Sequence, residues 1–381
     1  MRPSSKADIY LDYNASTPVD PRVADAMRPY LETAYGNPSS LHWSARPARE
    51  AVERARGQVA YLLGAHPDEI VFTSGGSEAD NLALKGVYFA HRDRGDHIIT
   101  SAAEHPAILE VCRFLERLGA QVTLLPVDRA CRVDPDDLAR AIGPRTILVS
   151  LMHANGEVGA IQPIEACARI AREHGILFHT DAAQTVGKVP IRVDDLGVDL
   201  LTVVGHKFYA PKGVGALYVR RGVVLEPLIH GGGHESGRRS GTESALLTAG
   251  LGEACALAQD LAPMAAVKAL RDRLWDQLHA AFGDRVVLNG HAEHRLPNTL
   301  NIAFVGRIGA EVLSALQGVA ASTGSACHEG RVEMSPTLAA MRVPPEVGQG
   351  AVRFSLGRGT TSEEIDAVVA QLIEIAAANV G

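Results

Sequence analysis

Short, continuous apolar runs alternate with helix-like segments through the first two-thirds of the chain, and this alternation limits the possible folds most strongly. The runs are rich in Val, Ile and Leu without polar alternation, which is typical of strands buried on both faces of a parallel sheet. Strand–helix alternation therefore predicts an α/β layer fold with a mainly parallel seven-stranded sheet. The predicted strands are 70–73, 97–100, 121–125, 146–151, 176–179, 200–204 and 215–219, with helices between them, such as 48–63 and 77–91.

The last third of the chain follows a different pattern. A long helical stretch over 245–282 precedes strand-like runs over 286–288, 299–304 and 352–356 and a final helix. That helix begins with a capping-box signature, Thr361 followed three residues later by Glu364. We therefore predict a large domain over 19–260 and a smaller α+β domain formed by 1–18 and 261–381.

Composition excludes several classes of protein. Of 381 residues, 46% are hydrophobic and 21% charged, as in a globular protein with a large core. The net charge of −7 and the lack of a dense Lys/Arg block disfavour direct nucleic-acid binding over a broad basic face. Five scattered Cys without a CxxC pair predict neither a disulfide scaffold nor a metal site. With no long apolar stretch and no signal-like N-terminus, we expect a cytoplasmic protein that does not enter a membrane.

Two charged residues follow neighbouring predicted strands. Lys207 comes directly after the strand 200–204, where burial could lower its pKa and let it form a Schiff base with an aldehyde. A solvated loop lysine is the alternative. Asp181 follows the preceding strand, where a carboxylate could keep a pyridine nitrogen protonated or could instead cap the next helix. The ordered pair is more informative than either residue alone.

A glycine-containing turn and a histidine follow two other predicted strands. Gly75, Gly76 and Ser77 connect a strand to a helix, an arrangement that lets backbone N–H groups approach an anion such as phosphate. An ordinary turn is the alternative, since the turn matches neither the Walker nor the GxGxxG pattern. His105 could stack on an aromatic cofactor ring or simply belong to a loop.

Cys327 differs from the other cysteines in its surroundings. Small residues surround it, and Gly324 and Gly330 flank it, which suits a nucleophilic thiol on an accessible, mobile loop. A buried structural thiol is the alternative, and the other four Cys lie in helical or strand-like patterns. Arg353 is a cation within an apolar strand, so it needs either a substrate carboxylate or a structural ion pair. The polar, glycine-rich segment 231–242 receives no role from its chemistry alone.

Taken together and in this order, these segments resemble the NifS/IscS-like cysteine desulfurases, fold-type I enzymes similar to class V aminotransferases. The resemblance covers essentially the whole chain and is carried by 10–18, 36–38, 153–159, 239–242, 325–327 and 353–358. It implies a homodimer with pyridoxal 5'-phosphate (PLP) as cofactor and L-cysteine as substrate. The implied products are L-alanine and a persulfide on Cys327, which would attack the substrate sulfur and pass it to a sulfur-acceptor protein.

The resemblance also implies roles for residues that would surround the cofactor ring. Lys207 would form the Schiff base and remove the Cα proton. His105 would stack on the ring, and Asp181 would pair with the pyridine nitrogen. Gln184 would bond the ring oxygen, and Asn155 would contact both ring and substrate.

The remaining implied roles concern the phosphate and the substrate. Gly76, Ser77 and His206 would hold the phosphate, and Thr242 would reach it from the other subunit. Arg353 would hold the substrate carboxylate.

Two local features of this chain can be compared with the family pattern. The family usually has Ser directly before Gly-His-Lys, whereas this chain has Val204, so one hydroxyl for the phosphate is missing. Thr202 lies on the same face of the strand and is our hypothesis for a compensating hydroxyl. The segment from Cys327 to Pro336 is at least as long as the catalytic loop of the long-loop members, which suits delivery of a persulfide.

The destination of the sulfur stays open at this point. Iron–sulfur cluster assembly and DNA phosphorothioation are the main pathways considered, and the residues after Cys327 look closer to the phosphorothioation desulfurase. Other readings are a different fold-type I enzyme, such as an aminotransferase or selenocysteine lyase, a sulfur-relay scaffold, or a phosphate-binding regulatory module. Retained activity after Cys327→Ala would favour an aminotransferase, and a colourless protein would favour the regulatory module.

Overall fold

The predicted seven-stranded sheet is present. The computed structural model describes residues 8–323, 326–328 and 331–378, without the side chains of 326–328, 331–333, 377 and 378. The strand order is β2-β8-β7-β6-β5-β3-β4, and only β8 runs against its neighbours. The strands are β2 (Ile70–Thr73), β3 (His97–Ser101), β4 (Gln121–Leu125), β5 (Thr146–Ser150), β6 (Leu177–Asp181), β7 (Leu200–Val204) and β8 (Gly215–Val219).

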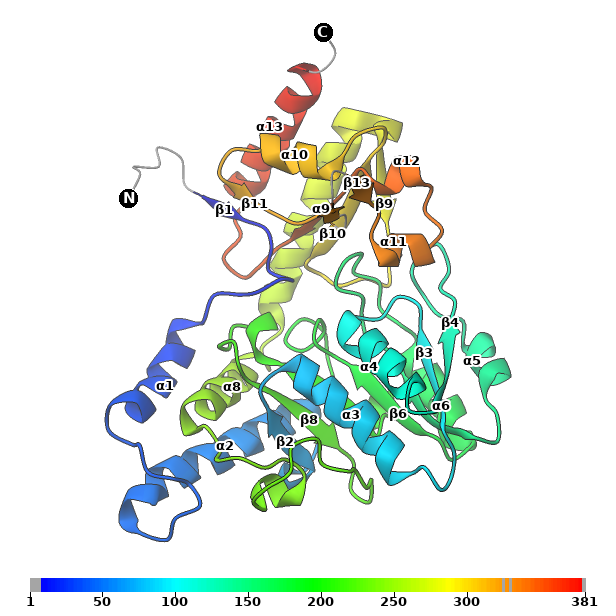
Figure 1. Cartoon of the computed structure of the whole chain (residues 1–381). Coiled ribbons are helices and arrows are strands. Elements are labelled where there is room, and N and C mark those ends of the chain that lie inside the picture. Colours follow the sequence, from blue (N-terminus) through cyan, green and yellow to red (C-terminus); the bar gives the residue numbers. More distant parts are fainter. Residues whose placement is uncertain (1–7, 324–325, 329–330, 379–381) are drawn as a thin grey trace.

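Helices cover both faces of this sheet (Figure 1). Neighbouring residues of one strand enter different apolar clusters: Leu200 packs with α3 and α4, whereas Leu201 packs with α2, α6 and α8. Burial on both faces explains why the strands read as continuous apolar runs. The helices of this lobe are α1 (Pro21–Glu32), α2 (Arg46–Leu63), α3 (Gly76–Ala90), α4 (Pro106–Glu116), α5 (Pro135–Ala141), α6 (Ile164–Glu173), α7 (Val193–Leu196) and α8 (Ala245–Leu257).

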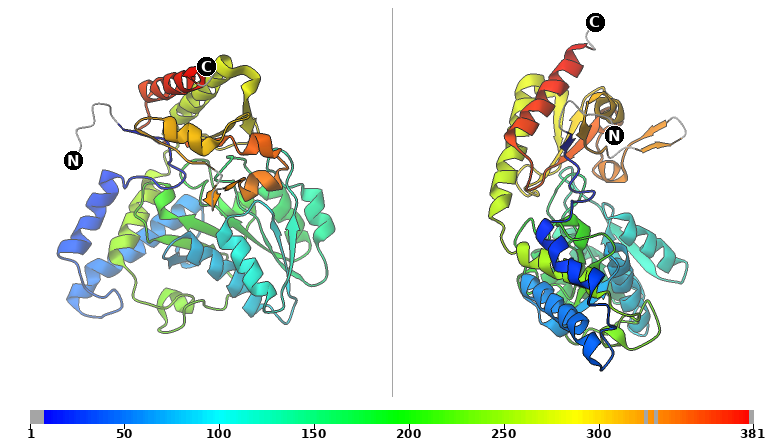
Figure 2. Two further views of the ribbon diagram at one scale, coloured as in Figure 1. Left: turned by 45° about the horizontal axis from the view of Figure 1, so that its top comes forward. Right: turned by 90° about the vertical axis from the view of Figure 1, so that its left-hand side faces the viewer.

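A second lobe contains the C-terminal third and the start of the chain (Figure 2). Its antiparallel sheet has the order β14-β10-β9, and the long helices α9 and α13 pack with it around an apolar cluster. The elements are β9 (Val286–Asn289), β10 (Thr299–Phe304), β14 (Ala351–Ser355), α9 (Ala262–Phe282), α10 (Gly309–Ala315), α11 (Pro336–Ala340), α12 (Pro345–Gly348) and α13 (Ser362–Ala378). The capping box at Thr361 and Glu364 forms as predicted, with both reciprocal hydrogen bonds present.

The N-terminal segment connects the two lobes. Strand β1 (Ile9–Tyr10) pairs in parallel with β11 (Val319–Ala320) in the second lobe, and the chain then passes down to α1 (Figure 1). Ile9 and Leu11 belong to the apolar cluster of that lobe. These contacts support the division that we propose, 19–260 against 1–18 with 261–381, and its bounds stay a prediction.

Two local predictions were wrong. The stretch 245–282 is not one helix, because α8 ends at Leu257 and α9 begins at Ala262. Pro263 explains the break, since a proline without an N–H fits the first turn of a helix but not its interior. The second concerns Cys327, predicted on a loop: its backbone lies in β12 (Ala326–His328), paired antiparallel with β13 (Arg331–Glu333). Across the described residues, no helix is long and apolar enough to cross a membrane.

Candidate active site

The carboxyl ends of five strands bring the predicted site residues to one edge of the large sheet. Strands β2, β3, β5, β6 and β7 run in the same direction, so the segments that follow them meet at that edge. Ligands of open α/β sheets bind in this position. The segments carry, in the same strand order, Gly76, His105, Asn155, Asp181 and Lys207.

Lys207 is a partly buried amine that contacts two backbone carbonyl groups. It ends a short 3₁₀ turn, η3 (Gly205–Lys207), directly after β7. Its Nζ donates to the carbonyl oxygens of Asn14, at 2.8 Å, and Ala15, at 3.0 Å. Burial and the nearby charge of Arg353 lower the pKa of Lys207 to about 8, against the opposing attraction of Asp181 and Asp12. The neutral, nucleophilic amine is therefore far more populated at pH 7 than in an ordinary lysine.

Asp181 is the last residue of β6 and is 7% exposed. Its Oδ1 accepts the N–H of Ala183 at 2.8 Å, which fixes the carboxylate in a turn and not at the start of a helix. Burial raises the pKa of Asp181, while the hydrogen bond from the Ala183 N–H and the electrostatic interactions with His105 and Lys207 act in the opposite direction. A fixed, buried carboxylate of this kind suits pairing with a protonated ring nitrogen.

A buried polar layer lies around Asp181. His179 is fully buried between Ser150, at 2.9 Å from Nδ1, and Thr202, at 3.1 Å from Nε2. Burial, together with the nearby charge of Asp181, raises the pKa of Asp80 well above its usual range. Burial also lowers the pKa of His179 to about 3, so the imidazole is neutral and links its two hydroxyl neighbours.

Glu104 is the second buried carboxyl of this layer. It accepts the Ser101 hydroxyl at 2.7 Å and the N–H of Met152 at 3.0 Å. Burial raises its pKa to about 8, and the charge of Asp181 acts in the same direction. Glu104 therefore joins the ends of β3 and β5 as a largely protonated acid at neutral pH. Sequence analysis gave it no role.

His105 is oriented by the start of α4. Its Nδ1 accepts the N–H of Ala107 at 3.1 Å, so the ring caps the helix and its neutral form carries the proton on Nε2. Burial lowers the pKa of His105, Lys207 acts in the same direction, and Asp181 opposes them. These contacts hold an uncharged imidazole beside Asp181 and Lys207, as stacking on a ring would require.

The predicted phosphate segment is the start of α3. Gly75 has φ +142°, which side-chain-bearing residues rarely adopt, and α3 begins at Gly76. A Cβ on Gly76 would lie 2.6 Å from a methyl group of Val204, so Val204 itself requires glycine here. Ser77 is exposed in the first turn. The backbone N–H groups of this helix end can therefore approach an anion.

His206 carries an unsatisfied polar atom in the same region. Its Nδ1 is buried and has no hydrogen-bond partner in the described part of the protein. Burial and the charges of Lys207 and Lys212 lower the pKa of His206 to about 4, so the ring is neutral. An unpartnered buried ring nitrogen suits a ligand oxygen as its missing partner.

The hypothesis that Thr202 compensates for Val204 was wrong. The Thr202 side chain is fully buried, and its hydroxyl bonds with His179 in the layer around Asp181. The side chains of Thr202 and Val204 share one face of β7, but Thr202 lies one step deeper in the sheet. No hydroxyl from this strand replaces the one that Val204 lacks.

Gln184 and Asn155 already have partners within the chain. The Gln184 amide donates to the Asn14 carbonyl at 3.1 Å and accepts from Lys188 Nζ at 2.8 Å. Asn155 Oδ1 accepts the N–H groups of Glu157 and Val158, both at 2.9 Å. Asn155 thus shapes its own turn, and its contact with ring and substrate stays a prediction.

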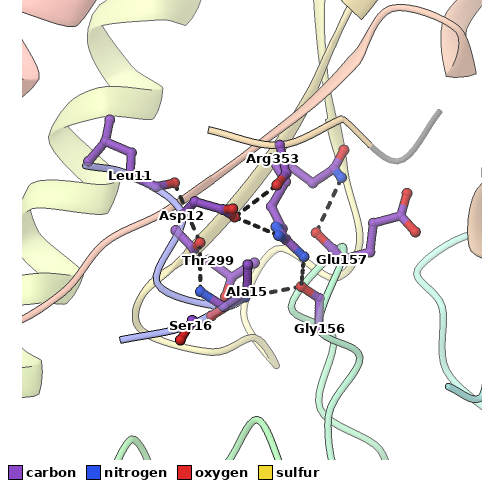
Figure 3. Close-up of polar contacts among 12 residues, drawn as sticks. Leu11, Asp12, Ala15, Ser16, Gly156, Glu157, Thr299 and Arg353 are labelled. Carbon is purple, nitrogen blue, oxygen red and sulfur yellow. Dashed lines mark hydrogen bonds and ion pairs between the residues drawn. The ribbon is translucent and has the colours of Figure 1, made fainter. Parts of the chain in front are cut away.

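Arg353 forms a structural ion pair. Its guanidinium reaches between Asp12 Oδ1, at 2.7 Å, and the carbonyl of Gly156, at 3.1 Å (Figure 3). The same Asp12 oxygen accepts the hydroxyl of Ser322 at 2.9 Å. Arg353 therefore has the structural ion pair that we named as one alternative. The ion pair also orients its guanidinium, which we expect to bind a substrate carboxylate.

Two ion pairs anchor the glycine-rich segment 231–242. Glu235 forms a two-pronged pair with Arg56, both contacts at 2.8 Å, and Arg239 pairs with Glu78 in the first turn of α3 at 2.8 Å. Thr242 follows on the exposed end of the segment. The segment is therefore fixed to the helix that begins at Gly76, while Thr242 is left facing solvent.

The four described cysteines are all buried and free. Burial raises the pKa of the Cys112 and Cys167 thiols to about 12, and raises those of Cys131 and Cys255 as well. Such thiols are poor nucleophiles. Cys131 lies in a turn at φ +66°, not in the regular pattern that we predicted. The side chain of Cys327 lies outside the described residues.

Asn14, Asp12 and Lys188 are the main residues that sequence analysis missed. Asn14 accepts both Lys207 and Gln184 on its carbonyl oxygen, and Lys188 donates to its side chain at 3.2 Å. The contacts of Lys207 and Lys188 with Asn14, and of Arg353 with Asp12, join residues more than a hundred positions apart, so spacing could not reveal them. The one available signal was Lys188 itself, because the chain has so few lysines.

The residues at this edge fit pyridoxal phosphate. The observations that support the fit are the unpartnered Nδ1 of His206 beside a glycine-led helix start, the buried carboxylate of Asp181 and the low-pKa amine of Lys207. The helix start and His206 would bind the phosphate, Asp181 would pair with the ring nitrogen, and Lys207 would react with the aldehyde. In the described part of the chain, no His, Cys, Asp and Glu side chains cluster to hold a metal ion.

Comparison with known proteins places the chain in a family. The class-V aminotransferase profile matches residues 9–368. A cysteine desulfurase IscS of Dictyoglomus turgidum is 49% identical over 365 residues, 95% of this chain and 92% of the relative. A solved NifS-like protein, 38% identical, superposes with a TM-score of 0.91 over 97% of this chain and 99% of its own. DndA from Streptomyces lividans, 37% identical, superposes with a TM-score of 0.77 over 90% and 97% of the two chains. The protein therefore belongs to the class-V aminotransferase family, and within it to the IscS/NifS-like cysteine desulfurases.

Proposed function

We propose that this protein is a PLP-dependent cysteine desulfurase that releases L-alanine and transfers the sulfur to Cys327. The observation that carries the proposal is the pair formed by Asp181 and Lys207 at the ends of adjacent strands. One is a buried carboxylate, and the other is an amine whose pKa is lowered to about 8. The relationship to IscS and NifS-like proteins identifies the chemistry that such a pair serves.

The side chains around this pair divide the work of binding and proton transfer. When bound, PLP supplies an aldehyde that captures the amine of L-cysteine and a ring that withdraws electrons. Asp181 would hold the ring nitrogen protonated, and His105 would stack on the ring. Lys207, released toward the carbonyls of Asn14 and Ala15, would take the Cα proton. Asn155 would contact both ring and substrate.

The phosphate and the substrate carboxylate would use separate groups. Gly76, Ser77 and His206 would bind the phosphate through the helix start and the buried Nδ1 of the His206 ring. Arg353 would bind the substrate carboxylate while its ion pair with Asp12 holds it in place.

The sulfur step involves Cys327. Its thiolate would attack the substrate sulfur, forming a sulfur–sulfur bond while the carbon–sulfur bond breaks and its electron pair stays with carbon. Protonation of that carbon gives L-alanine, and Cys327 becomes a persulfide, so atoms and electrons balance. The four described cysteines support this assignment, because they are buried thiols of raised pKa. The persulfide would then pass to an acceptor protein.

We also propose that the enzyme is a homodimer. An exposed apolar segment before α2 supports it, since Leu41 is 95% and Trp43 is 86% exposed, and single chains rarely leave such residues in solvent. Thr242 lies exposed at the end of an anchored segment and would complete a partner's phosphate site. Light scattering of the purified protein should give twice the mass of one chain.

Alanine and sulfide release from L-cysteine tests the proposed function. The assay compares wild type with Cys327→Ala and with Cys255→Ala, whose buried thiol serves as the matched control, and records the visible spectrum of each. We expect all three proteins to be yellow, with activity lost only in Cys327→Ala. Equal alanine release by wild type and Cys327→Ala would reduce the assignment to a general PLP enzyme.

Two pathways for the transferred sulfur, iron–sulfur cluster assembly and DNA phosphorothioation, agree with the relatives. The higher identity to IscS than to DndA, 49% against 37%, favours the first of the two. Sulfur transfer from the labelled Cys327 persulfide to purified candidate acceptors would distinguish them.

A further inference from the structure

Lys188 is a buried amine that the proposed mechanism does not use. It lies in the turn after β6 and is only 7% exposed. Its Nζ donates to two side-chain amide oxygens, Gln184 Oε1 at 2.8 Å and Asn14 Oδ1 at 3.2 Å. Within the described parts of the chain, it forms no ion pair with a carboxylate. Burying a lysine against neutral partners is costly, so its position calls for a reason beyond packing.

The Lys188 contact fixes which end of the Gln184 amide acts as the donor. An amide has an acceptor oxygen and a donor NH₂ group, and a flip exchanges them. Lys188 Nζ donates to Oε1, so it holds this oxygen toward itself. The NH₂ end is then the one that faces away, and here it donates to the Asn14 carbonyl at 3.1 Å. A phenolic ring oxygen is an acceptor and needs such a donor.

The second contact fixes the position of Asn14. Its Oδ1 accepts Lys188 and the amide of Asn298, the latter at 2.9 Å, and its Nδ2 donates to Thr299 at 2.8 Å. The Asn14 carbonyl in turn accepts Lys207 Nζ. Lys188 therefore supports both the amide beside the proposed ring site and the carbonyl on which the Schiff-base lysine rests.

We infer that Lys188 is a positioning residue of the cofactor site, which acts by holding the Gln184 amide in its donor orientation and the Asn14 carbonyl beside Lys207. The inference rests on the proposed function and goes beyond it, since it concerns a group that need not touch substrate or cofactor. The low pKa of Lys188, brought to about 7 by burial and by the charges of Lys207 and Arg353, agrees with a site that lacks a compensating carboxylate.

Lys188→Met tests this inference, with Lys268→Met on the exposed face of α9 as the matched control. Two quantities are measured: the PLP dissociation constant and the pH midpoint of the visible absorbance band. Loss of a donor to the ring oxygen disfavours its charged form, so the midpoint should move to higher pH. We expect Lys188→Met to weaken PLP binding about tenfold and to move the midpoint, and Lys268→Met to change neither.

A double-mutant cycle separates positioning from a general structural effect. If Lys188 acts through Gln184, then Lys188→Met should shift the midpoint no further in a Gln184→Ala background. An undiminished shift there would overturn the inference. So would a Lys188→Met protein that melts at a lower temperature but binds PLP and titrates like wild type.

Gln184→Glu keeps the test open if Lys188→Met does not fold. The glutamate retains an oxygen for Lys188 but has no N–H for the ring, so it should shift the midpoint in the same direction as Lys188→Met. A wild-type midpoint in Gln184→Glu would contradict the donor role. Alanine release and a yellow wild-type protein report on the proposed function separately, so either idea can fail without the other.

Discussion

Asp181 and His206 belong to two ends of the proposed cofactor site that are built differently. At the ring end, defined by Asp181 and the buried layer around it, most polar groups have partners within the chain. At the phosphate end, defined by Gly75–Ser77, Val204 and His206, the buried Nδ1 of His206 has no partner among the residues that the structure describes. Val204 also contributes a methyl group where the family usually has a hydroxyl.

This difference indicates which end depends on other molecules. At the ring end, the polar groups are held by other groups of the same chain. At the phosphate end, we propose that the partners come from the phosphate itself and from Thr242 of a second subunit. Substitutions at the ring end should therefore affect chemistry or stability, and those at the phosphate end should affect cofactor retention.

The largest expected effect is at the ring end. Asp181→Asn keeps the size of the side chain but removes the charge that would hold the ring nitrogen protonated, so kcat should fall at least about a hundredfold. Steady-state alanine release with saturating PLP measures it. Activity within a few fold of wild type would show that Asp181 does not stabilise the charged ring.

At the phosphate end, Val204→Thr should restore the missing hydroxyl while keeping a methyl group near Gly76. A hydrogen bond to a charged group strengthens PLP binding by about tenfold or more. The PLP dissociation constant measures it, with Val204→Ala as the control that adds no hydroxyl. Equal affinities of Val204→Thr and wild type would mean that the phosphate is already fully bonded without this strand.

Glu104→Gln should change the pH dependence of stability. The folded-state pKa of Glu104 is raised from 4.5 to about 8, so its contribution is fully present below pH 4.5 and is lost as the pH rises through 8. Glutamine has no proton to lose. The melting temperature of wild type should therefore fall relative to Glu104→Gln between pH 5 and pH 8, by a few degrees. Parallel melting curves over this range would show that Glu104 is ionised in the fold.

The smallest effect concerns Thr202, which we assign to the ring end. Thr202→Val removes the hydroxyl that bonds with His179, at a cost of about 1 kcal/mol and roughly 2 °C in melting temperature. PLP affinity should not change, because this hydroxyl is buried away from the phosphate segment. Weaker PLP binding by Thr202→Val would contradict this assignment and would mean that the Thr202 hydroxyl contributes to the phosphate site.

Sequence reasoning was most successful where one physical rule dominates. Burial on both faces made the strand runs continuous, so strands such as Leu200–Val204 and Gly215–Val219 were predicted at their observed bounds. It failed at residues 258–261, where Pro263 restarts a helix inside an apolar pattern that continues across the break.

The candidate site was predictable only in part. Parallel strands bring their carboxyl ends together, so Asp181 and Lys207 could be paired from order alone. Contacts with Asn14, Lys188 and Asp12 join distant segments, and no spacing rule encodes them. Thr202 is a second example. The sequence predicted which face of the sheet its side chain lies on, but not how far that side chain lies from the edge where the site is.

The most direct test of the central claim is mass spectrometry of the Cys327 peptide after a single turnover with L-cysteine and no reductant. The account predicts that this peptide gains one sulfur atom, in amounts matching the alanine released, while the peptides of the four buried cysteines do not. Alanine release with an unmodified Cys327 peptide would contradict the claim that Cys327 receives the sulfur.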